Sequence, residues 1–333
     1  MNAPNLKVSV ALCTYNGGNS VQTQLQSILR QSRLPDEIIV CDDGSQDDTV
    51  ETVRRVADQH PCPPIRLTRN AARLGFAKNF ESAIRQTTGH IVFLSDQDDL
   101  WFSDRIARMT LPFEQEPEVD LVYCDAALAD ASLKPTGETV FGRRRDMQLP
   151  GQRSPRQIGL GVGFNGCMMA FRSTLKDYCL PLCALWGHDH WIAFIAYATT
   201  EVRAIPEPLM YYRRHGNNAG LDPDLDGGWL SQYRWLAARR NLKLYAEHSR
   251  RWHAMLRALR QIKTRPGCYR DVTRLNEFIE ECCHRLQFAN ERDGLVHRGR
   301  LARIPAGVQY LVTGRYRRYA RGFRSFAKDM MIQ

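Results

Sequence analysis

The sequence contains the stretch VFLSDQDDLW at positions 92–101, in which apolar and small residues run directly into three carboxylates. A buried strand has this pattern where it emerges at the edge of a sheet. Asp96, Asp98 and Asp99 then lie close together, which is unfavourable unless a cation or a protein donor compensates the charge. The stretch therefore predicts a buried strand that ends in a polar turn.

Two interpretations of these aspartates are open from spacing alone. Closely spaced carboxylates suit Mg²⁺ or Mn²⁺, and such ions usually bind through one or two carboxylates plus substrate phosphates. Alternatively, Asp98 or Asp99 caps a helix that begins near Phe102. The other strand ends of the chain bear on this choice.

Similar strand ends occur earlier in the sequence. Strand-like runs at 6–13 and 37–41 end at Thr14-Tyr15-Asn16 and at Asp42-Asp43. Helical spacing follows each of them and returns over 77–87. Strands that alternate with helices are typical of a parallel α/β sheet with helices on both faces, whose ligands bind at the carboxyl ends of the strands. We therefore expect the three polar clusters to converge on one edge of the sheet.

Length and composition set further limits. The 333 residues suffice for two domains or one large domain with an appendage, and 43% hydrophobic content supports a full core. No apolar run approaches the roughly 18–20 residues of a membrane span, and the N-terminus does not have a signal-peptide pattern. Ten cysteines without a CxxC pair favour reduced thiols in a cytosolic protein over zinc or disulfides.

The C-terminal part has a different, helical character. Two apolar helix faces separated by Arg265-Pro266-Gly267 predict a helical hairpin. We expect the domain boundary in the loop 222–228, giving an α/β domain at 1–225 and a helical region at 226–333.

The tail of the chain is strongly basic. Residues 298–328 hold nine basic residues and no acidic one, whereas the rest of the chain carries only +1 of the net charge of +10. The tail also contains five aromatic residues, Tyr310, Tyr316, Tyr319, Phe323 and Phe326. This mixture suits an interfacial helix on an anionic membrane surface, or a helix that packs on the body with a solvated basic face. Nucleic acid is not favoured, because no recognised reading module accompanies the charge.

Five motifs in order resemble the inverting family 2 glycosyltransferases of GT-A fold. The resemblance covers roughly residues 6–220 and, more loosely, 310–328. It implies a Rossmann-like, mainly parallel sheet flanked by helices, followed by a C-terminal helical region. DQDD-x-W, GHD-x-W and YRRHGNN look most like the bacterial rhamnosyltransferase branch. The motifs are VSVALCTYNG (8–17), DDGS-x-D-x-T (42–49), SDQDD (95–99), GHD-x-W (187–191) and YRRHGNN (212–218).

The resemblance implies a site for a nucleotide sugar. Asp43 would accept from the imide N–H of uracil or thymine, or else simply cap the following helix. Thr14, Tyr15 and Asn16 resemble the family's base-and-ribose turn. Further basic residues match positions that face the nucleotide or its diphosphate oxygens, although solvated surface is an alternative for each: Lys78, Arg213 and Arg214.

The resemblance also implies a metal ion and a catalytic base. Asp98 would bind Mg²⁺ or Mn²⁺ directly, with Asp96 nearer the ribose or a metal-bound water and His215 as a late metal or phosphate contact. Asp99 is left to cap the next helix. Asp189 matches the base that removes the acceptor's hydroxyl proton, and a helix cap is its structural alternative.

These expectations define an enzyme. The resemblance implies transfer of a sugar, foremost L-rhamnose from dTDP-rhamnose, to a lipid-linked cell-surface polysaccharide such as O-antigen. A UDP-sugar-dependent galactosyl- or glucosyltransferase is the alternative within enzymes, and a non-catalytic nucleotide-sugar or glycan-binding protein is the alternative outside them. The expected location is cytoplasmic and peripheral on the inner face of the plasma membrane, and the sequence does not determine the oligomeric state.

Overall fold

A computed structural model of the chain describes residues 6–143, 154–160, 164–215, 243–320 and 322–331. The chain divides into two compact units. Unit 1 comprises Met1–Gln152, Gly163–Ala196 and Thr200–Gly220, and unit 2 comprises Arg153–Val162, Tyr197–Thr199 and Leu221–Gln333. The predicted boundary at residues 225 and 226 lies outside the described residues, as do Asn217 and Asn218 of the last motif.

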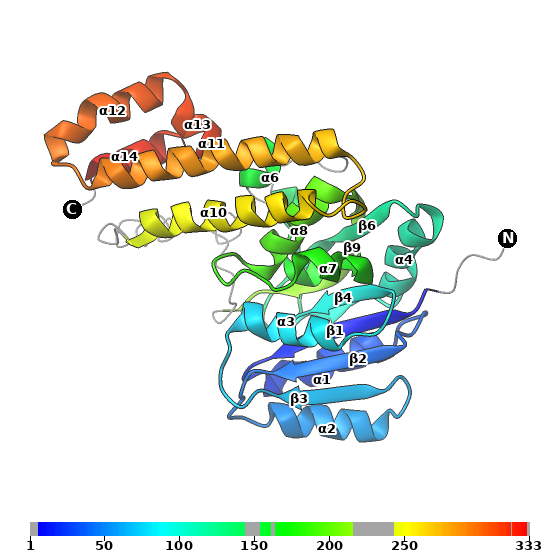
Figure 1. The fold of residues 1–333 in the computed structure, drawn as a ribbon. Helices are drawn as coiled ribbons and strands as arrows, with labels where there is room; N and C mark the ends of the chain where they lie inside the picture. Colours follow the sequence, from blue (N-terminus) through cyan, green and yellow to red (C-terminus); the bar gives the residue numbers. More distant parts are fainter. Residues whose placement is uncertain (1–5, 144–153, 161–163, 216–242, 321, 332–333) are drawn as a thin grey trace. The chain divides into compact units, whose positions relative to one another are not determined.

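Unit 1 alternates strands and helices and then becomes more irregular (Figure 1). Its first elements are β1 (Val8–Thr14), α1 (Gly18–Leu29), β2 (Glu37–Asp42), α2 (Thr49–Gln59), β3 (Ile65–Arg69), α3 (Phe76–Gln86), β4 (Ile91–Ser95), β5 (Leu100–Trp101), α4 (Arg105–Gln115) and β6 (Val119–Ala129). Its later elements are β7 (Pro135–Thr139), α5 (Val140–Arg143), the 3₁₀ helix η1 (Gly166–Met168), β8 (Met169–Arg172), η2 (Ser173–Leu175), α7 (Lys176–Cys179), α8 (His188–Thr199) and β9 (Glu201–Arg213). The last three residues of α8 are counted with unit 2.

The first half of the sheet is parallel, as predicted. Strands β3, β2, β1 and β4 are neighbours in that order, and every residue of β1, β2 and β4 is buried. Burial on both faces explains why these strands read as continuous apolar runs. In the register, Thr14 pairs with Asp42 and Leu12 pairs with Ser95, so three strands end at the same edge. The predicted convergence of their polar ends is confirmed.

The second half of the sheet is mixed, which the strand pattern did not reveal. Strand β8 lies antiparallel between β4 and β6, and the long strand β9 runs parallel to β6 and antiparallel to β5. Leu100 pairs with Tyr211, which brings the end of β9 beside the aspartates that follow β4. This pairing carries a distant segment of the chain to the carboxyl edge. The predicted α/β class is confirmed.

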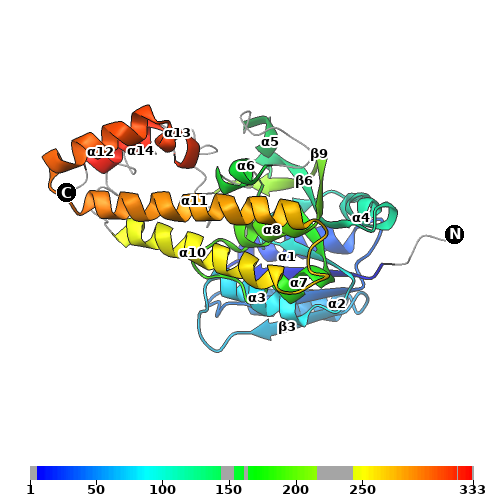
Figure 2. The same cartoon turned by 45° about the horizontal axis from the view of Figure 1, so that its top comes forward.

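Unit 2 is helical. Helices α10 (Lys243–Lys263) and α11 (Val272–Val296) lie side by side as the predicted hairpin, visible in Figures 1 and 2. Their apolar faces meet: Met255, Leu259 and Phe278 are fully buried. The unit also contains α6 (Pro155–Leu160), α12 (Arg300–Val312), α13 (Arg315–Tyr319) and α14 (Phe323–Met331). None of the helices within the described ranges is both long and apolar enough to cross a membrane.

The basic tail packs against this hairpin around a buried acid. Asp329 is fully buried and accepts hydrogen bonds from Tyr245 and Tyr316 at 2.7 Å each. Arg292 on α11 donates to both carboxylate oxygens, at 2.6 and 2.7 Å. Tyr316 is fully buried, and among the predicted interfacial aromatics Phe323 is the largely exposed one, at 65%. The tail is therefore an integral part of unit 2.

Candidate active site

A cavity of about 1000 Å³ opens at the carboxyl edge of the sheet in unit 1. Eight of the predicted site residues line it, namely Thr14, Tyr15, Asn16, Asp43, Asp96, Asp98, Arg213 and His215. The structure brings these residues together from β1, β2, the turn after β4 and the end of β9. The other predicted residues, Lys78, Arg214 and Asp189, are not among the cavity's lining residues.

The end of β2 forms one wall of the cavity. Asp42 is fully buried and accepts from Thr14 Oγ1 at 2.8 Å and from the Ser45 N–H at 2.9 Å, so its role is to hold the turns in place. Asp43 accepts from the N–H groups of Leu74 and Gly75, at 2.7 and 2.9 Å, and from Asn70 Nδ2 at 3.0 Å. A carboxylate offers about four acceptor positions. Three bonds therefore fix the orientation of Asp43 and leave one acceptor position of its carboxylate.

The turn after β1 contacts two residues that the sequence prediction missed. The guanidinium of Arg73 lies 3.9 Å from the centre of the Tyr15 ring. Gln97 accepts from the Tyr15 N–H at 2.8 Å and donates to the Tyr15 carbonyl at 3.1 Å. Gly17 leaves room for this amide, since a Cβ there would lie 2.2 Å from Gln97 Oε1. The reciprocal pair ties the Tyr15 turn directly to the aspartate stretch.

Asn16 has a conformation that helps to shape the same turn. Its φ of 49° lies in the left-handed region, which asparagine tolerates better than most residues. Its side chain accepts from the Gln46 N–H and its own N–H donates to Ser45 Oγ, both at 2.9 Å. Asn16 thus joins the turns after β1 and β2.

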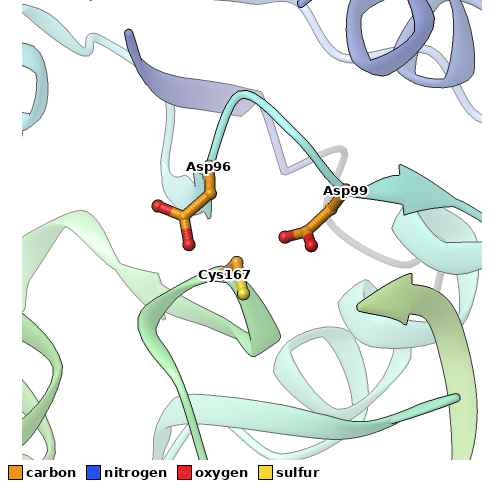
Figure 3. Close-up of side chains that lie close together, drawn as sticks. All are labelled: Asp96, Asp99 and Cys167. Atoms are coloured by element: carbon orange, nitrogen blue, oxygen red, sulfur yellow. The ribbon is translucent and has the colours of Figure 1, made fainter. Parts of the chain in front are cut away.

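The aspartates after β4 form a crowded group. Figure 3 shows the side chains of Asp96, Asp99 and Cys167 close together. One carboxylate oxygen of each aspartate and the Cys167 sulfur all lie within 4.8 Å of one another. Burial and the negative charges of Asp98 and Asp189 raise the pKa of Asp96 to about 7. Burial and the Asp99 and Asp96 carboxylates raise the pKa of Cys167 well above its ordinary value, so its thiol stays protonated.

Asp98 points toward the end of β9. His215 Nε2 lies 2.8 Å from Asp98 Oδ2. Two neighbouring ligands in the octahedral shell of Mg²⁺ or Mn²⁺, each about 2.1 Å from the ion, are separated by about 3 Å. The two side chains are hydrogen-bonded to each other at close to this spacing, and a cation would relieve the charge repulsion that raises the pKa of Asp96. The residues therefore fit a hard divalent cation bound through Asp98 and His215, with Asp96 close by.

Asp99 does not cap a helix, and this expectation is wrong. Residues 100 and 101 pair with β9 as strand β5, so helix α4 begins later, at Arg105, after Asp104. Asp99 is 1% exposed and accepts from the Arg213 N–H at 3.3 Å. Burial, followed by Asp98 and Asp96, raises the pKa of Asp99 well above its ordinary value. Asp99 is not among the residues that line the cavity, and it holds the end of β9 through the Arg213 N–H.

Basic residues near the cavity differ in where they point. Arg213 is 9% exposed, lines the cavity and donates to Ser20 Oγ on α1 at 3.3 Å. Lys78 instead forms an ion pair with Glu81 at 2.7 Å. The Arg214 N–H donates to the Ala129 carbonyl, which continues the pairing of β9 with β6. Of the three predicted basic residues, Arg213 is the one that lines the cavity.

Asp189 lies in the first turn of α8, after Gly187 at the N-cap position. Burial opposes its ionisation, but the hydrogen bond from His190 and the charges of His188 and His190 lower the pKa of Asp189 below its usual range. Its side chain is 23% exposed and is a carboxylate at neutral pH. Because its charge contributes to the raised pKa of Asp96, the two acids share one electrostatic environment.

His188 precedes this acid and is buried. Its ring stacks on Phe80 with 4.0 Å between centroids, and neither ring nitrogen has a hydrogen-bond partner within the described residues. Burial lowers the pKa of His188, so the ring is neutral near pH 7. A Cβ at Gly166 would lie 2.2 Å from His188 Nε2. The aromatic stack and this glycine together set where α8 starts.

Comparison with known sequences identifies a family. The profile described as "Glycosyl transferase family 2" matches residues 9–179. An uncharacterized glycosyltransferase of Nostoc is 22% identical over 230 residues, which are 64% of this chain and 66% of the relative. The UDP-Glc:alpha-D-GlcNAc-diphosphoundecaprenol beta-1,3-glucosyltransferase WfaP of Escherichia coli is 25% identical (65% and 80% covered). The dTDP-rhamnosyl transferase RfbG of Shigella flexneri is 26% identical (62% and 72%). The chain spans slightly under two thirds, or less, of the length of the first relatives it matches.

Comparison with solved structures supports the fold. The mannosyltransferase PcManGT from Pyrobaculum calidifontis, in complex with GDP-Man and Mn²⁺, has a TM-score of 0.53 at 18% identity, with 98% of this chain and 86% of that chain covered. TarS from S. aureus, in complex with UDP-GlcNAc, has a TM-score of 0.54 at 14% identity, with 84% and 72% covered. The predicted GT-A fold with a helical C-terminal region is confirmed.

Proposed function

Because this chain belongs to glycosyl transferase family 2, we propose that it is an inverting glycosyltransferase that moves a sugar from a nucleotide donor to a lipid-linked oligosaccharide. The observation that carries the proposal is the cavity in which Asp43, Asp98, Arg213 and His215 meet. A nucleotide sugar presents a base N–H, an anionic diphosphate and a reactive anomeric carbon. Asp43 offers an acceptor for the base, Arg213 a positive charge for the diphosphate, and Asp96 with Asp98 a pair of carboxylates for a metal ion.

The contacts support the proposed donor-binding roles. Asp43 accepts from the imide N–H of the base with its remaining acceptor position, and the Tyr15 ring with Arg73 covers the base. Arg213, held beside Ser20, pairs with diphosphate oxygens. Thr14 and Asn16 keep the ribose turn in shape. Lys78 and Arg214 stay predictions as further nucleotide contacts.

Asp98 and His215 would hold Mg²⁺ or Mn²⁺, with Asp96 toward the ribose or a bound water. When bound, this ion neutralises negative charge on the leaving diphosphate. Asp189 is the proposed base: it takes the proton of the acceptor hydroxyl as that oxygen attacks the anomeric carbon. Asp189 is a carboxylate at neutral pH and so can accept the proton, while its lowered pKa makes it a weaker base than an ordinary aspartate.

We propose L-rhamnose from dTDP-rhamnose as the donor. The motif resemblance and the 26% identity to a dTDP-rhamnosyl transferase support this choice, whereas relatives named as UDP-Glc transferases support the alternative. A thermal-shift panel of dTDP- and UDP-sugars with Mn²⁺ separates them. Stabilisation by dTDP-rhamnose beyond that by dTDP alone is expected. Stabilisation by UDP-glucose or UDP-galactose alone would select the alternative.

The acceptor is proposed to be a lipid-linked intermediate of a cell-surface polysaccharide such as O-antigen. This implies a place at the inner face of the plasma membrane, which the enzyme reaches from the cytoplasm through its basic tail. We propose residues 1–225 as the catalytic domain and 226–333 as the region that carries this tail.

Two substitutions test the mechanism. Asp189→Asn should lower transfer by about 10²–10⁴-fold, the range of one lost general base, while donor binding stays unchanged. Asp177→Asn, at an exposed acid on α7, is the matched control. Asp98→Ala should abolish the metal-dependent thermal shift, with Asp104→Ala, half exposed, as its control.

Two outcomes would reject the proposal. Near wild-type turnover in either site variant would disprove the assigned mechanism. A wild-type protein that binds nucleotide sugars without metal-dependent transfer or donor hydrolysis would be a binding module instead.

A further inference from the structure

Helix α12 presents its apolar side chains to solvent and buries a charge. Leu301 is 83% exposed and Val312 80%, whereas Arg303 is 6% exposed. Ile304 and Val308, at 46% and 42%, lie on the same face as Leu301 and Val312 because helical residues three, four and seven apart share a side. This arrangement is the reverse of an ordinary surface helix. We call these four residues the α12 stripe.

The inward face of α12 explains this orientation. Arg303 donates to the carbonyl of Val296, the last residue of α11, and to the carbonyls of Arg298 and Asp329, at 2.8, 2.8 and 3.2 Å. A cation suits the end of a helix, where carbonyl groups are unpaired. Rotating α12 to bury its apolar residues would leave these carbonyls without that donor.

A glycine on the same face fixes the contact with α14. A Cβ at Gly307 would lie 2.5 Å from Met330 Cε and 3.2 Å from Phe326 Cε2. Gly307 is one turn after Arg303, so both residues face α14 and the end of α11. The α12 stripe is therefore directed outward by specific contacts of unit 2.

Charge around the stripe indicates what covers it. Residues 298–328 carry nine basic residues and no acid. Exposed arginines lie just before the helix at Arg298, on its first residue Arg300, and after it at Arg317, Arg318 and Arg324. An apolar helix face bordered by arginines suits an anionic lipid surface, where acyl chains meet the apolar side chains and headgroups meet the cations.

We propose that the α12 stripe is the membrane-inserting face of this protein, seated among the headgroups of an anionic bilayer with the flanking arginines on lipid phosphates. The inference rests on the proposed function in that the lipid-linked acceptor lies in such a bilayer. It differs from the sequence expectation in assigning insertion to aliphatic residues of α12, because Tyr316 is buried against Asp329.

The test is sedimentation with vesicles, using the full chain. Wild-type protein should bind phosphatidylglycerol-containing vesicles, bind pure phosphatidylcholine weakly, and release with rising salt. Leu301→Asn with Val312→Asn should weaken binding by roughly tenfold or more, because two large apolar side chains no longer partition. Leu34→Asn with Leu111→Asn, at residues 46% and 47% exposed in unit 1, is the matched control. Leu301→Trp with Val312→Trp should tighten binding, which misfolding cannot explain.

Other results overturn the proposal. Equal vesicle binding by wild type and the asparagine variant would show that the α12 stripe does not contact the membrane. Absence of vesicle binding would do so too, as would a wild-type dimer that becomes a monomer in this variant, since a second copy would then cover the stripe. Donor hydrolysis measured without vesicles should be the same in all these variants. If the wild-type protein showed no donor hydrolysis, the proposed function would be rejected, but the result on membrane binding would still hold.

Discussion

Gln97 shows how one uncharged side chain can link two parts of the cavity in unit 1. Its amide makes a reciprocal pair of hydrogen bonds with the Tyr15 backbone, while its neighbours Asp96 and Asp98 line the same cavity. A residue between two carboxylates therefore sets the position of the Tyr15 turn, which is proposed to cover the base. Its role is positioning, because it acts through Tyr15.

Gln97→Ala should weaken donor binding more than it slows transfer. The substitution leaves the N–H and carbonyl of a part-buried turn unpaired, at a cost of about 1–3 kcal/mol. We expect the KM for the donor to rise roughly tenfold, with kcat changed by less than about threefold. Gln22→Ala removes a glutamine that pairs with Arg55 on the surface and should leave both constants unchanged. A fall in kcat alone would argue against the positioning role.

The raised pKa of Asp96 predicts how metal binding depends on pH. A carboxyl group must lose its proton before it can bind or attract a cation. Burial and the neighbouring negative charges raise the pKa of Asp96 to about 7. Mn²⁺ affinity without donor should therefore fall by up to about tenfold for each pH unit below 7 and level off above it. Calorimetric titration between pH 6 and pH 8 measures this. A pH-independent affinity would show that Asp96 takes no part.

The raised pKa of Asp96 also makes the stability of the metal-free protein depend on pH, but in the opposite direction to the metal affinity. Between the ordinary pKa of an aspartate, about 4, and pH 7, the folded metal-free protein binds more protons at Asp96 than the unfolded chain does. Its contribution to the unfolding free energy therefore falls as the pH rises through this window. Metal should remove that dependence.

At the scale of elements, the strands and helices of the first half could be predicted because each is determined locally. Full burial of β1, β2 and β4 gives continuous apolar runs, and strand ends in a parallel sheet meet at one edge. The antiparallel insertion of β8 and the pairing of β9 with β5 depend on contacts between distant residues. That pairing is why Asp99, expected at a helix cap, lies buried beside the end of β9.

The start of α8 depends on a close contact that a side-chain addition would disrupt. In Gly166→Ala the new Cβ would press on the His188 ring, which is held by its stack on Phe80. We expect a loss of about 1–3 kcal/mol in unfolding free energy and lower transfer, because Asp189 follows His188 directly. Urea unfolding and transfer assays measure both effects.

A helical glycine provides the control. Gly294→Ala in α11 meets no atom within 4 Å and should stabilise the protein by about 0.5–1 kcal/mol. If Gly166→Ala were as stable and active as the wild type, the His188 contact would not determine where Asp189 lies.

At the scale of the whole molecule, the sequence predicted an α/β part and a helical part but not what stabilises the second. The helical hairpin follows from two amphipathic faces. The buried Asp329 is the one acid near the end of a basic tail, and composition alone suggests a solvated surface there. Its partners Tyr245 and Arg292 are distant in sequence, so only the folded unit shows that the tail is part of the core. The inverted orientation of α12 has the same origin, since it depends on Arg303.

Asp329→Ala should therefore destabilise unit 2 without altering the donor cavity. Removing this carboxylate leaves the Arg292 guanidinium, 13% exposed, and two tyrosine hydroxyls without their acceptor. Breaking such a buried pair costs about 3–5 kcal/mol. Urea unfolding should show that loss. Mn²⁺-dependent binding of nucleotide should persist at temperatures well below the melting temperature, since the residues that line the cavity all belong to unit 1. Asp293→Ala, at a partly exposed acid on α11, should cost less than about 1 kcal/mol. Equal losses of unfolding free energy in the two variants would mean that Asp329 is not the residue that joins the tail to the hairpin. The outward orientation of the α12 stripe would then depend on the contacts of Arg303 and Gly307 alone.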